Sequence, residues 1–356
     1  MNPYENLPIE SFWRTAIADK KPHQISNTWK PKFKLNKGHK IATAGSCFAQ
    51  HISKALVNRR YTWVNGEPAP NGLSLEAQQS FNYGTFSFRT GNIYTTALLR
   101  QWLEWALTNK SVPDEVWMNG GRFYDPFRPA IEPDGFYSLE EMQVSRNDTL
   151  SAIRDVFMQT RLFIFTLGLT EAWINAEHNY IYPMCPGTVA GKFDAKIHRF
   201  KNYTHQQTYR DLRESFRLIK KINPGIKFLL TVSPVPLTAT ATNKHVLVAN
   251  TYSKSTLRSV AGEMAATRPD VDYFPSYELI TSFPFHGMFF KENLRSVTPE
   301  GINFVMNSFF SCLGATPPKN KEIEAAPEIS VTSNNESDVI CEEELLAAFG
   351  PDKGVQ

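Results

Sequence analysis

The stretch Ile41-Ala42-Thr43-Ala44-Gly45-Ser46-Cys47-Phe48-Ala49-Gln50 decides how this chain is organised. A short apolar run reaches Gly-Ser-Cys, and apolar side chains then recur at Phe48, Ile52 and Leu56, which is helical spacing. The pattern predicts a strand, a tight turn and a helix, with Ser46 in the turn. A serine hydroxyl there can cap the helix. The same free amides and helix dipole can instead stabilise a negative oxygen beside a reactive hydroxyl, so both interpretations stay open.

Composition is that of an ordinary globular protein. The 356 residues are 42% hydrophobic and 21% charged, with a net charge of +3, which is too small to indicate a nucleic-acid partner. No apolar run approaches the roughly 20 residues that cross a bilayer, and the first residues lack a signal-peptide pattern. The four cysteines have no metal-ligand spacing and indicate a reducing compartment. We therefore expect a cytoplasmic protein with no membrane span, no metal and no cofactor.

Buried strands alternate with helices along the chain. Continuous apolar runs predict strands at 162–168, 228–232 and 271–274, and helical spacing predicts helices at 139–160, 206–222, 252–266 and from 299 onward. This order predicts an α/β fold, a three-layer sandwich with a central parallel sheet. Residues 66–96 and 169–205 are interpreted as irregular loop insertions. Ligands of such sheets bind at the carboxyl ends of strands, where Ser46, Gly168 and Ser233 lie.

Three segments follow from composition. Residues 1–39 are a polar lead-in that contains tryptophans and is expected to pack on the domain, and residues 40–314 form the domain itself. Residues 315–356 are acidic and rich in Pro, Ser and Asn, and are expected to be mostly disordered. An apolar island at 340–349 is expected to fold on a protein partner or on the body of the protein.

Five sequence blocks resemble the GSCFA domain family, which is itself similar to the SGNH/GDSL hydrolases. The blocks are Gly45-Ser46-Cys47-Phe48-Ala49, Asn82-Tyr83-Gly84-Thr85, Thr166-Leu167-Gly168-Leu169-Thr170-Glu171-Ala172-Trp173, Thr231-Val232-Ser233-Pro234-Val235-Pro236 and Tyr273-Phe274-Pro275-Ser276-Tyr277-Glu278. The resemblance covers residues 40–312 and implies an SGNH/flavodoxin-like fold. It implies that Ser46 is the nucleophile. It also implies an oxyanion hole formed by the Ser46 amide, Gly84 and Thr170, where Thr170 replaces the asparagine of the SGNH pattern.

The sequence departs from that pattern at the catalytic base. SGNH enzymes carry Asp-x-x-His before the last helix, and the corresponding residues here are Asn293-Leu294-Arg295-Ser296. His286 and His245 follow the third and second predicted buried strands and are the alternative bases. Cys47 is an alternative nucleophile, because a helix N-terminus lowers the pKa of a thiol.

In a third interpretation, the fold keeps the site as a binding pocket and has lost the hydrolytic activity. Arg128, Arg199 and Arg295 would then anchor an acidic sugar or a phosphate. The prediction is an SGNH-like serine esterase or O-acyltransferase that acts on an acyl ester of a saccharide, as in polysaccharide modification. The opposing hypothesis is a catalytically inactive module that binds a glycan or a protein partner.

Overall fold

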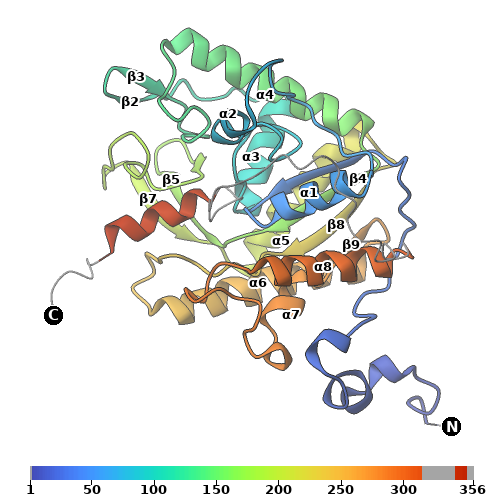
Figure 1. The fold of residues 1–356 in the computed structure, drawn as a ribbon. Coiled ribbons are helices and arrows are strands. Elements are labelled where there is room, and N and C mark those ends of the chain that lie inside the picture. The colour runs from blue at the N-terminus through green and yellow to red at the C-terminus, as the bar shows by residue number, and fades with distance from the viewer. Residues whose placement is uncertain (1, 315–340, 351–356) are drawn as a thin grey trace. The chain divides into compact units, whose positions relative to one another are not determined.

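Four parallel strands form the central sheet, in the order β1-β4-β8-β9 (Figure 1). The computed structural model describes residues 2–314 and 341–350. The strands are β1 (Ile41–Gly45), β4 (Leu162–Leu167), β8 (Lys227–Val232) and β9 (Val271–Tyr273). Every residue in them except Lys227 is buried, which explains why they appear as continuous apolar runs. The predicted mixed α/β fold with a central parallel sheet is confirmed.

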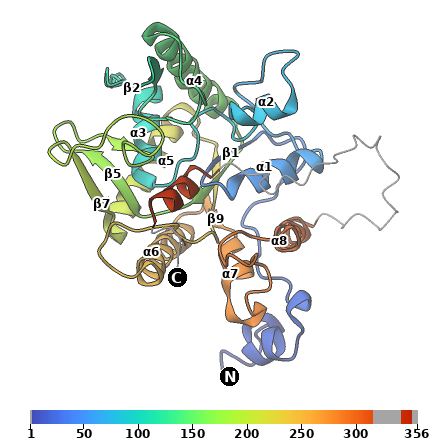
Figure 2. The ribbon, with the colours of Figure 1, turned by 60° about the vertical axis from the view of Figure 1, so that its left-hand side comes forward.

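Helices flank this sheet, as Figure 2 shows from a second direction. They are α1 (Ala49–Asn58), α4 (Leu139–Gln159), α5 (His205–Ile222) and α6 (Val246–Thr267). Aromatic pairs join helix to strand. The ring centroids of Phe157 in α4 and Phe163 in β4 are 4.9 Å apart, and those of Phe216 in α5 and Phe228 in β8 are 3.8 Å apart.

The insertions carry more regular structure than the sequence indicates. Residues 169–205 were expected to be irregular, but they form an antiparallel sheet in the order β6-β5-β7. Its strands are β5 (Glu171–Asn175), β6 (Ile181–Tyr182) and β7 (His198–Asn202). The remaining elements are α2 (Leu75–Ser80), α3 (Thr96–Leu107), β2 (Trp117–Asn119), β3 (Arg122–Tyr124), α7 (Ser276–Thr281), α8 (Pro299–Cys312), η1 (Ile9–Ser11), η2 (Arg14–Ala18), η3 (Pro22–Gln24), η4 (Phe283–Phe285) and η5 (Glu342–Phe349).

Two loop segments cover the outer edge of β1. The amide of Ile41 donates to the Thr62 carbonyl at 2.9 Å, and the amide of Ser87 donates to the Thr43 carbonyl at 3.0 Å. Further along, the Ile93 amide donates to the Gly45 carbonyl at 2.8 Å. The loop that contains Ile93 is thereby held at the carboxyl end of β1, next to Ser46.

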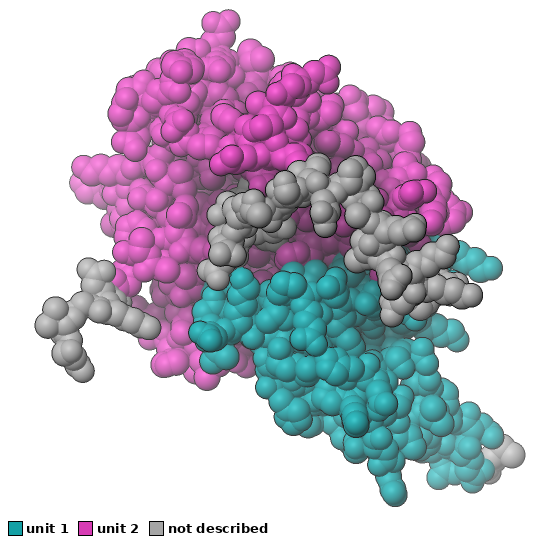
Figure 3. All heavy atoms as spheres, viewed as in Figure 1, with its two compact units in different colours: residues 1–35, 274–338 teal, residues 36–273, 339–356 magenta. Residues whose placement is uncertain are grey.

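The chain divides into two compact units (Figure 3). Unit 1 comprises residues 1–35 and 274–338, and unit 2 comprises residues 36–273 and 339–356. Within unit 1, Trp29 of the lead-in stacks on Phe309 of α8 with ring centroids 5.5 Å apart, whereas most of residues 2–24 are exposed. Unit 2 holds the central sheet.

The C-terminal tail is described only in part. Its residues 315–340 and 351–356 lie outside the described residues, so the expected disorder there is not addressed. Residues 342–349 form the 3₁₀ helix η5, which belongs to unit 2 together with the sheet. Of the two expectations for the apolar island, the structure shows packing on the body of the protein. Over the described ranges, no helix has the length and apolar character of a membrane span.

Candidate functional site

The turn after β1 leaves the Ser46 hydroxyl buried and uncommitted. Gly45 has φ +132°, and a Cβ there would lie 2.3 Å from the Thr166 carbonyl oxygen, so the turn requires glycine. The Ser46 hydroxyl has no hydrogen-bond partner among the described residues. The residue at the N-cap of α1 is Phe48, and no side chain caps that helix. The capping interpretation of Ser46 is therefore not what the structure shows.

The backbone amide of Ser46 is already committed. It donates to the Thr166 carbonyl at 3.0 Å and so extends the pairing of β1 with β4. An amide used in this way is not available to a negative oxygen, although the resemblance implied that role.

The turn after β4 closes on Ser46 from one side. A Cβ at Gly168 would lie 3.0 Å from the Ser46 Cβ, which places this glycine in contact with the serine. Thr170 is almost fully buried, and its hydroxyl also lacks a partner within the described part of the chain. The buried amine of Lys254, from α6, donates to the Gly168 carbonyl at 2.9 Å. A buried cation next to this turn favours negative charge there.

The loop 91–94 supplies donors that already hold a carboxylate. The side-chain amide of Asn92 donates to the Glu342 carboxylate of η5, and the Tyr94 hydroxyl donates to the same oxygen at 3.0 Å. The Asn92 backbone also hydrogen-bonds to this carboxylate. Burial raises the pKa of Glu342, although these hydrogen bonds act in the opposite direction. These donors offset part of the cost of burying the Glu342 carboxyl group.

Backbone hydrogen bonds connect this loop to both strand ends. Besides the bond from Ile93 to Gly45, the amides of Gly168 and Leu169 donate to the Tyr94 carbonyl at 3.2 and 2.9 Å. Asn92 and Tyr94 are therefore fixed between the turn that carries Ser46 and the turn that carries Thr170. Burial raises the pKa of the Tyr94 phenol well above its ordinary value, so the phenol remains a donor.

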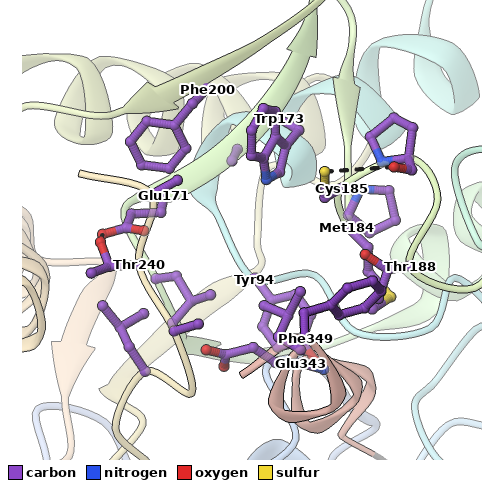
Figure 4. A pocket seen from close by; sticks show the side chains of 18 of the residues that line it. Tyr94, Glu171, Trp173, Met184, Cys185, Thr188, Phe200, Thr240, Glu343 and Phe349 are labelled. Carbon is purple, nitrogen blue, oxygen red and sulfur yellow. Dashed lines mark hydrogen bonds between the residues drawn. The ribbon is translucent and has the colours of Figure 1, made fainter. Parts of the chain in front are cut away.

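A largely apolar cavity of about 390 Å³ adjoins this loop. Figure 4 shows Glu171 and Trp173 of β5 on one side and Glu343 and Phe349 of η5 on another. Burial raises the pKa of Glu171, whose carboxylate accepts from the Thr240 hydroxyl at 2.8 Å. The other lining residues include Leu169, Met184, Phe200, Leu237 and Leu346. The cavity can receive an apolar or ring-shaped group beside a few polar contacts.

The structure places the predicted oxyanion-hole glycine and the three predicted arginine anchors in environments that differ from one another. Gly84, at φ +67°, is exposed, and no atom of the described residues lies within 4 Å of the position that its Cβ would take. Gly91 instead lines the site, because a Cβ there would lie 3.1 Å from a Glu342 carboxylate oxygen. Arg128 is fully buried and pairs with Asp125 at 2.8 Å, so it does not offer a surface anchor for an anion. Arg199 is exposed on β7. Arg295 belongs to unit 1.

Neither of the two histidines predicted as catalytic bases hydrogen-bonds to the Ser46 hydroxyl in the described structure. His245 is exposed at the N-cap of α6, where its Nδ1 accepts from the Leu247 amide at 3.2 Å. Because the Ser46 hydroxyl has no partner among the described residues, no histidine of unit 2 hydrogen-bonds to it. His286 is exposed after η4 in unit 1, with φ +52°.

The block before the last helix forms a local turn in unit 1. The side-chain oxygen of Asn293 accepts from the amides of Arg295 and Ser296 at 3.0 and 2.9 Å. Cys47 is buried directly after Ser46. The described residues contain no group of three or more His, Cys, Asp or Glu that could hold a metal.

Sequence reasoning missed four residues of the site, which are Asn92, Tyr94, Lys254 and Glu342. A signal for the first two was available, since Thr90-Gly91-Asn92 combines a flexible glycine with polar side chains in an otherwise aromatic-rich loop. Lys254 also left a trace, because it lies three residues before Leu257 on the apolar face of α6. Glu342 gave none, because it lies 250 residues from Asn92.

Comparisons with known proteins identify a family for this chain. The model of the GSCFA family matches residues 40–309. A solved carbohydrate esterase family 3 structure from Talaromyces cellulolyticus is similar over 78% of this chain and 100% of its own, at 9% identity and a TM-score of 0.33. An acetyl xylan esterase from the rumen bacterium Butyrivibrio proteoclasticus is similar over 79% of this chain and 66% of its own, at 10% identity and a TM-score of 0.30. The comparison with curated proteins gives no significant match.

Proposed function

The chain belongs to the GSCFA family, and we propose that it is a serine-dependent esterase or O-acyltransferase that acts on acyl esters of saccharides. One observation carries the proposal. The buried hydroxyl of Ser46, which has no hydrogen-bond partner in the described part of the chain, adjoins a loop whose donors, Asn92 and Tyr94, hold a carboxylate. A carboxylate is the product of ester hydrolysis and resembles the reacting acyl group in its pair of oxygens.

The proposed reaction has two steps. The Ser46 oxygen attacks the acyl carbonyl, and the oxyanion accepts hydrogen bonds from Asn92, Tyr94 and the hydroxyl of Thr170. The bond to the sugar oxygen breaks, and that oxygen leaves as an alcohol after it takes up a proton. Water or a second hydroxyl then attacks the acyl-serine and releases Ser46. The base that accepts the Ser46 proton stays a prediction, with His245 and His286 as its candidates.

The saccharide part of the proposal rests on the cavity beside the loop. Trp173 and Phe200 offer aromatic faces, on which the C–H face of a sugar ring can pack. Glu171 and Thr240 offer hydrogen-bonding groups for ring hydroxyls. Both kinds of contact occur on the same cavity wall, which suits a ligand with apolar faces and polar edges.

The test is an assay of p-nitrophenyl acetate hydrolysis and of labelling by a fluorophosphonate probe. It compares the wild type, Ser46→Ala, Cys47→Ala and the exposed-serine control Ser151→Ala. A further arm uses Glu342→Ala, in which the occupying carboxylate is gone. We expect Ser46→Ala to lose labelling and turnover, and Ser151→Ala to retain both. Labelling that persists in Ser46→Ala but disappears in Cys47→Ala would assign the chemistry to the thiol instead.

A second candidate function is a binding module without catalysis. The observation that favours it is that no histidine or carboxylate among the described residues hydrogen-bonds to the Ser46 hydroxyl as a base would. A base that is already in place normally lies within hydrogen-bond distance of its nucleophile, although this distance is often longer before substrate binds. If neither the wild type nor Glu342→Ala is labelled or turns over ester, the binding module is the better description.

A further inference from the structure

We propose that the site beside Ser46 binds an acidic, amphipathic peptide, and that its ligand is residues 341–350 of the chain itself. The segment occupies the donors that an acyl ester would need and therefore competes with substrate. The binding claim stands on the contacts of η5. Only the identity of the displaced substrate rests on the proposed function.

The first anchor of the segment is Glu342. Its carboxylate accepts from the side chains of Asn92 and Tyr94, and the residue is only 8% exposed. Burying a carboxylate costs free energy unless donors replace its lost water. The loop replaces part of that water with an amide, a phenol and backbone hydrogen bonding, although burial still outweighs these hydrogen bonds and raises the pKa of Glu342.

The second anchor is the adjacent residue, Glu343. Its carboxylate accepts from the Thr238 amide at 2.7 Å, and its own amide donates to the Tyr94 hydroxyl at 3.3 Å. Glu343 is 7% exposed, whereas the next residue, Glu344, is exposed. Two of three consecutive glutamates are thus taken out of water, and both are bound. A segment that merely rested on the surface would keep all three in solvent.

The apolar residues of η5 supply the rest of the contact. Leu346 and Phe349 line the cavity whose other walls include Trp173 and Leu237 (Figure 4). They lie three and six residues after Glu343, so all three side chains share one face of a 3₁₀ helix. The segment therefore combines carboxylates at the polar loop with apolar side chains at the apolar cavity.

Occupancy by the segment and by an acyl group is mutually exclusive. Asn92 and Tyr94 direct their side-chain donors at Glu342, and the same donors would have to hold an oxyanion at Ser46. A ligand that prefers one state shifts the protein toward that state. Because the segment is part of the same chain, its binding is intramolecular, and it therefore competes with any added ligand.

The experiment measures binding of a fluorescein-labelled synthetic peptide with the sequence of residues 341–350. It uses the full-length wild type, the full-length variants Glu342→Ala and Leu346→Ser, and the exposed-glutamate control Glu344→Ala. Glu342→Ala and Leu346→Ser, the two opening variants, weaken the docking of the chain's own segment. We therefore expect the peptide to bind each opening variant at least about tenfold more tightly than it binds the wild type. Glu344→Ala is expected to bind the peptide as the wild type does.

Two results overturn the proposal. One is equal affinity of the peptide for the wild type and both opening variants, and the other is no binding to any of the chains. The ester assay separates this proposal from the proposed function. If the peptide binds as expected while no chain hydrolyses ester, the peptide site stands and the proposed function fails. If all chains hydrolyse ester equally through Ser46 while the peptide does not bind, the function stands and the peptide site fails.

Discussion

Replacing Arg128 by methionine removes one of two guanidinium groups that neutralise a buried carboxylate. Asp125 is fully buried, and its two carboxylate oxygens lie 2.8 Å from Arg128 Nε and 2.8 Å from Arg146 Nη2. Burial would raise the pKa of Asp125, but the two arginines outweigh it and lower that pKa. Arg128 also donates to the hydroxyls of Thr149 and Ser145 at 2.8 and 3.0 Å. Breaking such a buried pair from one side costs about 3–5 kcal/mol.

The assay is thermal unfolding followed by circular dichroism, with Arg199→Met as the matched control. Arg199 is exposed, so its substitution is expected to change the free energy of unfolding by less than about 0.5 kcal/mol. At roughly 2–4 °C per kcal/mol, Arg128→Met should lower Tm by about 6–20 °C. Equal Tm values for the two variants would refute the structural role of Arg128. An unchanged Tm together with weaker binding of an anionic ligand would restore it as an anchor.

Three further predictions concern the site. Gly45→Ala places a Cβ 2.3 Å from the Thr166 carbonyl oxygen at φ +132°, so it is expected to lower the free energy of unfolding by more than about 3 kcal/mol. Gly84 also has a positive φ but has open space around it, so Gly84→Ala should lower the free energy of unfolding by only about 1–2 kcal/mol. Thermal unfolding of the two variants checks this, and similar losses would count against the strained turn. Lys254→Met removes the donor to the Gly168 carbonyl and should lower the free energy of unfolding by at least about 1 kcal/mol. It should also slow fluorophosphonate labelling of Ser46. Unchanged labelling would exclude an influence of Lys254 on the site. Docking of η5 should weaken as pH rises, because burial raises the pKa of Glu342 in the docked state above its ordinary value of 4.5. The stabilisation is complete below pH 4.5 and is lost as the pH rises through the raised pKa of the docked state. Tyr94 contacts Glu342 directly, and Cys341, Cys47 and Glu343 act electrostatically on Tyr94. Peptide affinity for Glu342→Ala in acidic and in mildly alkaline buffer tests the sign, and tighter binding in the alkaline buffer would contradict it.

The central sheet could be predicted because its strands are buried on both faces. β4 and β8 are continuous apolar runs, and the position of Ser46 at a strand end follows from the same pattern. The strands β5 and β7 were missed for the opposite reason. They are only partly buried and carry polar side chains such as Glu171 and Lys201, so no apolar run marks them.

The details of the site depend on contacts that sequence spacing does not reveal. Arg128 was predicted as an anchor for an acidic sugar or a phosphate, but it is buried and pairs with Asp125, three residues earlier. Gly84 and Gly91 both precede polar loop residues and both have positive φ, and only the fold shows which of them adjoins the site. The docking of Glu342 on Asn92 spans most of the chain, and no local pattern encodes it.

The cover along β1 also protects the protein against association. β1 is the first strand of the sheet, and its outer backbone groups would otherwise be a template for pairing with another chain. The loop that covers this edge also carries Asn92 and Tyr94, so it cannot move far from the site without exposing the strand. Substitutions that loosen the loop, such as Ser87→Pro, would therefore threaten solubility together with ligand binding. Opening of the site is better assigned to η5, whose departure leaves the backbone of β1 covered.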